Sequence, residues 1–348
     1  DLLEDVWVLG LTPGNERLTK LQTVGAPPAP ARRSAGNVTS SDPLQFFGGE
    51  DENAAPLTDE WQLASDGGAS RLAARPGSPW PRATMSQVFN PDLNEHWFYG
   101  GRVGNLLPVA ALYRLSDAGF TELEDLDPRG VPHDPRWGAA AVYDTVNHRM
   151  VLFGGIGPLP GGGGSGTLDD VLTFAVENGA LVRQPLAPAG ELPDPRYGAV
   201  AGYDPRGQRM LVFGGTKSIS GSDDTNELWE LSLVRGQERW RLVDAAGARP
   251  DPLFLPAGAL TREQPPNLYV LGTLARPAGM RASLVDRLWR ITLDQPNPAW
   301  VEVTLPDFRP RPRIFPAFSY DAVQNRLVLS GGAHDPVYRN DVWQLLLP

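Results

Sequence analysis

The sequence contains no cysteine, and this absence excludes disulfides, thiolate metal sites and cysteine nucleophiles. It also lacks any apolar run of about 18 residues, the length that a membrane-spanning helix needs. Basic residues are the minority: 31 Lys and Arg stand against 41 Asp and Glu, for a net charge of −10. Because nucleic-acid binders present a basic surface, this balance disfavours a nucleic-acid partner.

Glycine and proline are abundant instead, with 38 and 35 in 348 residues. Both residues break helices and mark turns, so a bundle of long helices is excluded. An apolar share of 41%, including 10 Trp, 12 Phe and 8 Tyr, is enough for a hydrophobic core and argues against disorder. Length alone would suggest two domains, but all-β folds often exceed 200 residues as one unit. We expect a single domain over 1–348.

One pattern repeats along the chain every 54 to 60 residues. It begins Pro-Arg-aromatic-Gly in its clearest copies, continues into a small apolar stretch ending in Tyr-Asp, and closes an Arg-led apolar run with Gly-Gly. The clearest copies begin at Pro135 and Pro195. The arginine position is held in successive copies by Arg32 or Arg33, Arg82, Arg136, Arg196, Leu255 and Arg313.

Each copy predicts four short strands. The first is small and apolar, the second is an apolar run stopped by two glycines, and the third and fourth each carry an aromatic residue, as in 227–231 and 239–243. Four strands in about 50 residues are typical of a kelch-type propeller blade. We expect the glycine pair to supply positive φ where the second strand leaves the sheet. We expect the aromatic rings to fill the space between blades.

The Gly-Gly doublets, the acidic-x-Trp third strands and the fourth-strand Trp resemble those of the kelch family, over nearly the whole chain. The resemblance implies an all-β fold, a kelch-type β-propeller of four-stranded blades. It says little about function, because propellers host unrelated activities. Copper radical oxidases of the galactose-oxidase type need a tyrosine crosslinked to cysteine, so the missing cysteine excludes that activity.

The strand census leaves the number of blades open. Third strands number seven, whereas first strands and Gly-Gly second strands number six. We favour seven blades with an incomplete first blade, which an upstream segment would complete because an exposed edge is a liability. The alternative is six blades, the last taking its fourth strand from 17–24. The repeats are placed at 1–30 (partial), 31–80, 81–134, 135–194, 195–253, 254–311 and 312–348 (partial).

No motif in the sequence predicts a catalytic group, a metal or a cofactor. The four histidines fall at different points of the repeat and form no metal-ligand pattern. They are His96, His133, His148 and His334. Acidic clusters after the glycine pairs fit turn chemistry or an occasional calcium ion. The run 161–166 lacks the Lys and Ser/Thr of a phosphate loop and is interpreted as a flexible loop.

The repeated arginine is the candidate ligand-binding residue. First strands of a propeller line its central channel, so these arginines would meet at one mouth and bind carboxylates there. The candidates are Arg33, Arg82, Arg136, Arg196 and Arg313. In the alternative interpretation each arginine pairs with an acid of its surroundings, such as the aspartate that ends the same strand. Those aspartates are Asp144, Asp204 and Asp321.

The sequence therefore predicts a non-catalytic interaction module. It would bind a protein or glycan ligand, with a preference for anions, at the channel mouth, within a larger surface or secreted assembly outside the cytoplasm. The alternative is a carbohydrate-acting enzyme resembling the sialic-acid mutarotases of the kelch fold. That resemblance implies charged groups at the channel mouth, for which Glu50 is the acid/base candidate.

Overall fold

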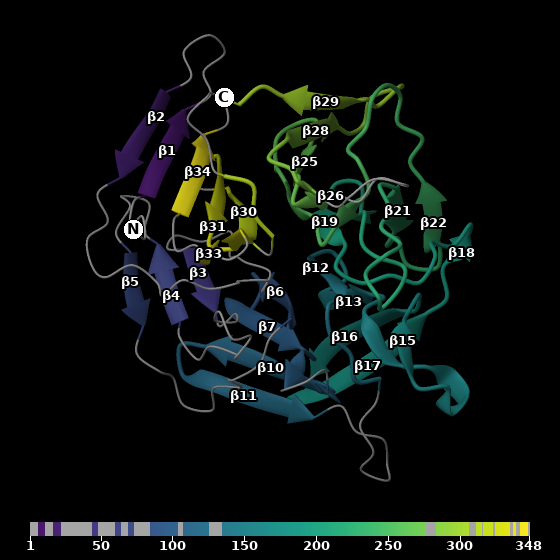
Figure 1. Cartoon of the computed structure of the whole chain (residues 1–348). Coiled ribbons are helices and arrows are strands. Elements are labelled where there is room, and N and C mark those ends of the chain that lie inside the picture. Colours follow the sequence, from purple (N-terminus) through teal and green to yellow (C-terminus); the bar gives the residue numbers. More distant parts are fainter. Residues whose placement is uncertain are drawn as a thin grey trace.

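The computed structural model describes residues 6–10, 17–21, 44–47, 60–63, 69–72, 84–103, 107–124, 134–275, 283–305, 311–314, 316–322, 324–334, 337–338 and 342–346. Strands dominate these residues, and their helical content is the single 3-10 turn η1 (Pro160–Gly162). Within these ranges no helix has the length and hydropathy to cross a bilayer. The sheets are arranged around a common centre in chain order (Figure 1).

The larger sheets are built from strands that follow one another along the chain. The first contains β3 (Leu44–Phe47), β4 (Glu60–Leu63) and β5 (Ala69–Leu72). The second contains β6 (Ser86–Asn90), β7 (Glu95–Tyr99), β10 (Ala111–Ser116) and β11 (Gly119–Glu124). The third contains β12 (Ala140–Asp144), β13 (Arg149–Phe153), β16 (Val171–Glu177) and β17 (Ala180–Leu186).

Two further sheets have the same plan. One contains β19 (Val200–Asp204), β20 (Arg209–Phe213), β21 (Leu228–Ser232) and β22 (Arg239–Leu242), with β18 (Ala189–Gly190) added at its edge. The next contains β24 (Ala257–Leu260), β25 (Asn267–Leu271), β28 (Leu288–Thr292) and β29 (Trp300–Val303). Short strands form small accessory sheets: β8 (Arg102–Val103), β9 (Leu107–Pro108), β14 (Ile156–Pro158), β15 (Ser165–Thr167), β23 (Leu253–Phe254), β26 (Leu274–Ala275), β27 (Ser283–Leu284), β32 (Ala333–His334) and β33 (Val337–Tyr338).

The last large sheet joins the two ends of the described chain. It contains β30 (Ala317–Asp321), β31 (Arg326–Ser330), β34 (Val342–Leu346), β1 (Val6–Gly10) and β2 (Arg17–Leu21). β1 runs parallel to β34, with Val6 opposite Val342, and β2 pairs antiparallel to β1. The sequence placed β1 in the third strand of a separate partial blade; its pairing places it in the sheet of C-terminal strands instead.

The chain is all-β, and its antiparallel four-stranded sheets fit a propeller of kelch type. The first strands of successive sheets contact one another in the order β6, β12, β19, β24, β30. They therefore surround the centre, while the fourth strands β11, β17, β22 and β29 lie on the outside (Figure 1).

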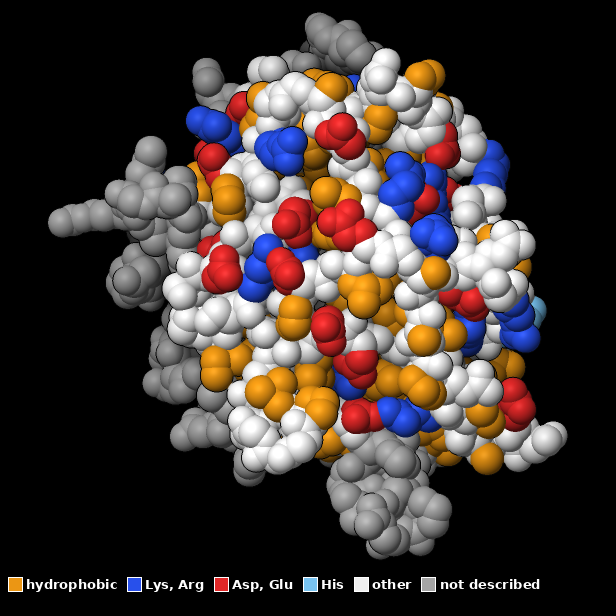
Figure 2. Space-filling model, turned by 90° about the vertical axis from the view of Figure 1, so that its right-hand side faces the viewer, with side chains coloured by type: hydrophobic (Ala, Val, Ile, Leu, Met, Phe, Trp, Pro, Cys, Tyr) orange, Lys and Arg blue, Asp and Glu red, His pale blue; other side chains and the backbone are white. Residues whose placement is uncertain are grey.

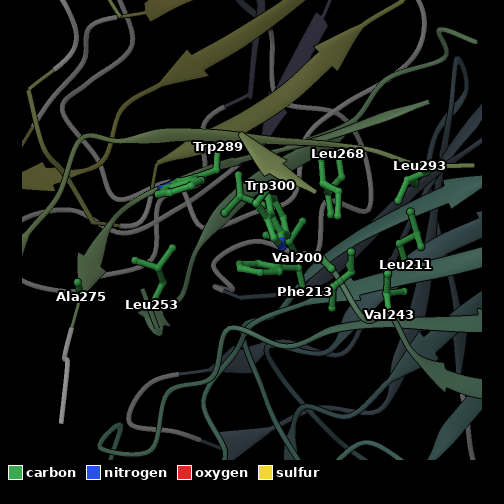
Figure 3. Packing of buried hydrophobic residues seen from close by; sticks show 14 residues of the cluster. Val200, Leu211, Phe213, Val243, Leu253, Leu268, Ala275, Trp289, Leu293 and Trp300 are labelled. Atoms are coloured by element: carbon green, nitrogen blue, oxygen red, sulfur yellow. The ribbon is translucent and has the colours of Figure 1, made fainter. Parts of the chain in front are cut away.

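Aromatic side chains fill the space between neighbouring sheets, as predicted. Phe213 of β20 packs edge-on against Trp300 of β29, with ring centroids 5.0 Å apart. Phe153 of β13 meets Trp240 of β22 in the same way at 4.9 Å. Figure 3 shows the cluster around Phe213 and Trp300, in which every labelled side chain is hydrophobic. The fourth-strand Trp thus reaches back to the second strand of the sheet before it and joins the two by apolar burial.

The Gly-Gly pair forms the backbone junction between sheets. Gly154 and Gly155 have φ of 68° and 98°, which confirms the predicted positive φ. The Gly155 amide donates to the carbonyl oxygen of Arg196 in the next sheet at 2.9 Å. A Cβ on Gly154 would overlap that same oxygen. The preceding junction is alike, with Gly101 donating to the Arg136 carbonyl at 2.9 Å.

We expect Gly154→Ala to destabilise the fold by at least about 2 kcal/mol, because it adds a backbone clash to an unfavourable φ. The matched control is Gly163→Ala, since Gly163 has φ of −73° and its nearest neighbour to a new Cβ is Leu159 at 3.8 Å. The control should lie within about 0.5 kcal/mol of wild type. Urea unfolding of both variants measures this, and equal losses would contradict the junction.

Candidate functional site

The candidate arginines that the structure describes are fully buried. Arg136 and Arg196 are 1% exposed and Arg313 is 2% exposed. Arg33 and Arg82 lie outside the described residues. The three described side chains therefore do not present open guanidinium groups to solvent.

Each buried arginine is bonded within its own sheet. Arg136 makes a two-pronged ion pair with Asp170, from Nη1 to Oδ1 at 2.7 Å and from Nη2 to Oδ2 at 2.9 Å. Its Nη1 also donates to the carbonyl of Gly154 at 3.1 Å, and its Nε to that of Asp134 at 3.2 Å. Asp170 directly precedes the third strand, so the arginine fastens the start of the first strand to the second and third strands.

The same arrangement recurs in later copies. Arg196 donates from Nη2 to Glu227 Oε2 at 2.8 Å and from Nη1 to the Gly214 carbonyl at 3.4 Å. Arg313 donates from Nη1 to the Gly331 carbonyl at 2.9 Å. These contacts favour the structural alternative for the arginines. Ligand binding by them stays a prediction, which the Arg196 variant below tests.

The acidic partners that we predicted for the arginines are wrong. The aspartates that end the first strands bind the arginine at the start of the second strand instead. Asp204 Oδ2 accepts from Arg209 Nε at 2.9 Å, and Asp321 Oδ2 from Arg326 Nε at 2.8 Å. Each aspartate also caps the turn between the strands; Asp204 Oδ1, for example, accepts the Arg206 amide at 3.1 Å.

A row of tyrosines lies near the opposite end of the first strands. Tyr203 of β19 donates its hydroxyl to Asp144 Oδ1 in the preceding sheet at 2.8 Å. Tyr143 of β12 donates likewise to Asp92 Oδ2 at 2.9 Å. Each hydroxyl ties one sheet to the turn of its neighbour. Sequence reasoning treated this tyrosine only as part of the repeat, although its recurrence before Asp144 and Asp204 was the visible signal.

The first strands enclose a central cavity of about 430 Å³. Its aromatic lining is Phe89, Tyr143, Tyr203, Phe318 and Tyr320. The cavity begins near the middle of the strands, at the level of Gln87 and Phe318, and runs to the turns that follow the tyrosines. It thus opens at the tyrosine end of the strands, whereas the arginines precede the strand starts.

Charged groups at the tyrosine end are few and unevenly paired. Asp92 Oδ2 lies 2.8 Å from His148 Nδ1, and that hydrogen bond outweighs burial and lowers the pKa of Asp92. Arg262 lines the cavity mouth, is exposed, and makes no ion pair with the described residues. One guanidinium is therefore open to a ligand at this mouth.

The cavity tyrosines are held as neutral hydrogen-bond donors. Burial, and then the hydrogen bond to Asp144, raise the pKa of Tyr203 to about 12. Burial and the contact with Asp92 also raise the pKa of Tyr143. Both hydroxyls stay protonated at neutral pH, which suits positioning and binding rather than action as a base.

The described residues contain no group of three or more His, Asp and Glu side chains that could hold a metal ion. His96 is buried among aromatic rings, with Phe47 and Phe89 both 5.2 Å away between centroids. His148 is exposed beside Asp92. His133, Glu50 and the side chain of His334 lie outside the described residues.

No family model matches the chain. Its structure is similar to the solved structure of YjhT, with a TM-score of 0.63 and 14% sequence identity; the match covers 88% of this chain and 91% of that chain. At this identity the likeness concerns the fold alone. Together with the antiparallel sheets, it is compatible with a kelch-type propeller.

We expect Arg196→Ala to lower the free energy of unfolding by about 2–4 kcal/mol, because Glu227 and the Gly214 carbonyl lose a buried donor. Arg239→Ala, at an exposed arginine, is the control and should change it by less than about 0.5 kcal/mol. Thermal melts with and without citrate measure both roles. A neutral melting temperature together with a lost citrate response would show that Arg196 is a receptor instead.

Glu227 should make stability depend on pH. Burial raises the pKa of Glu227, but hydrogen bonds from Trp229 and Arg196 and the charges of Arg196 and Lys217 outweigh it and lower the pKa to about 2. A lowered pKa contributes stability above the usual value of 4.5 that is lost as the pH falls toward 2. The stability difference between wild type and Glu227→Gln should therefore narrow over that range in urea titrations. A constant difference would contradict the ion pair.

Proposed function

We propose that this chain is a binding module whose ligand enters the central cavity from the tyrosine end. One observation carries the proposal: a cavity of about 430 Å³ walled by aromatic side chains, with an exposed arginine at its mouth. Small-ligand sites are concave, mainly apolar, of about 300–1,000 Å³, and hold a few polar groups that orient the ligand. The ligand is a small molecule, or a ring that projects from a protein or glycan.

The charge at the mouth favours an anion. Arg262 in the lining and Arg206 in the neighbouring turn are both exposed, and neither is ion-paired among the described residues. On the side of the molecule shown in Figure 2, by contrast, basic and acidic side chains lie interspersed. Because the chain carries a net charge of −10, open guanidinium groups at a cavity mouth are sites where a carboxylate gains most.

The same proposal includes a ring of six blades around the cavity. It is supported by the pairing of β1 and β2 with β34, which adds the N-terminal strands to the last sheet. This differs from the seven blades that the strand census favoured. It corresponds to the six-bladed alternative, in which 17–24 extend the last blade.

The second candidate is an enzyme that acts on an anionic sugar and resembles the kelch-fold sialic-acid mutarotases. It is favoured by the contact of the lining residue Tyr143 with Asp92, which also binds the His148 imidazole. Histidine titrates near neutral pH and can relay protons. NMR of N-acetylneuraminate mutarotation decides: a rate above buffer that is lost in His148→Ala supports the enzyme, and a rate equal to buffer rejects it.

We expect Arg262→Gln to weaken binding of benzoate, a one-ring carboxylate, by about tenfold or more, because a charged contact is lost. Arg206→Gln is the matched control: the residue is the same type and exposed, but it does not line the cavity. It should change affinity by less than about threefold. Titration calorimetry at constant ionic strength measures all three proteins. No benzoate binding by wild type would overturn the proposed anion site.

A further inference from the structure

Two buried polar atoms inside the cavity have no hydrogen-bond partner: Gln87 Oε1 and Ser319 Oγ. Ser319 is 5% exposed. The Gln87 amide nitrogen lies 3.4 Å from His96 Nδ1, so the nitrogen is engaged and the carbonyl oxygen is left over. Buried polar atoms in proteins are almost always satisfied, so each of these atoms indicates a group supplied from the cavity.

The two atoms lie at the deep end of the cavity, away from Arg262. Ala322 holds the position in its copy of the repeat that Arg262 holds in the preceding copy, three residues after Ser319. Three residues of strand span about 10 Å. The wall between the two levels includes the rings of Phe89 and Tyr320. The cavity therefore has a cationic mouth, an aromatic middle and a polar, uncharged end.

We propose that the ligand is a one-ring organic anion with a hydroxyl opposite its carboxylate. The carboxylate binds Arg262, the ring packs on the aromatic wall, and the hydroxyl donates to Gln87 Oε1 and accepts from Ser319 Oγ. A six-membered ring with hydrogen bonds of about 2.8 Å at both ends bridges the span between the two poles. This inference rests on the proposed function and adds the polarity of the ligand to it.

The test compares benzoate with 4-hydroxybenzoate, which differ by the one hydroxyl. Wild type should bind 4-hydroxybenzoate about fivefold to tenfold more tightly, the usual worth of one hydrogen bond. Ser319→Ala should reduce this preference and Ser319→Ala with Gln87→Met should abolish it, with benzoate affinity unchanged. Arg262→Gln should weaken both compounds equally and keep their ratio.

The melting temperature without ligand separates binding from a structural role. Ser319→Ala should be at least as stable as wild type, because the lost hydroxyl has no partner in the protein. A clear drop in its melting temperature would show that the hydroxyl is structural and would overturn the inference.

The binding results separate the two proposals. Equal affinity of wild type for both compounds would overturn the inference and leave the proposed anion site standing. Binding of neither compound would overturn both.

Discussion

The fold depends on one backbone junction, in which a glycine pair of one sheet receives the arginine carbonyl of the next. No side chain fits there, because a Cβ on Gly154 would collide with the Arg196 oxygen. The arginine side chain then turns back into its own sheet and binds the acid ahead of the third strand. One residue thus links two sheets through its backbone and three strands through its side chain.

The copy that departs from this pattern changes as a unit. Leu255 stands in place of the arginine, Arg287 stands where the acid precedes β28, and Gly272 is followed by Thr273. The Thr273 hydroxyl there donates to the Phe254 carbonyl at 2.8 Å. Losing both members together avoids a buried charge without a partner, which is the costly state. The buried arginine and its acid therefore behave as a single structural device.

Much of the fold follows from the sequence, because local rules govern it. Strand lengths, the four-strand repeat and the positive φ at Gly154 and Gly155 depend on residues that are close in the chain. The partner of Arg136 does not, since Asp170 lies 34 residues away and is reached only through the sheet. The parallel pairing of β1 with β34 likewise depends on how the two ends of the chain meet.

The candidate site was placed at the wrong end of the first strands for a physical reason. Arginine is conspicuous in a sequence, whereas its burial depends on a carbonyl and a carboxylate brought by other strands. The tyrosines looked like core, yet their rings line the cavity while their hydroxyls bind the neighbouring turn. Orphaned atoms such as Ser319 Oγ cannot be recognised before the packing is known.

The most direct test of this account asks at which end of the first strands the anion binds. NMR of the assigned aromatic rings during a benzoate titration reports this in one experiment. We expect shifts at the cavity rings of Phe89, Tyr203, Phe318 and Tyr320. Shifts confined to Trp137 and Tyr197, which follow the buried arginines, would contradict the account.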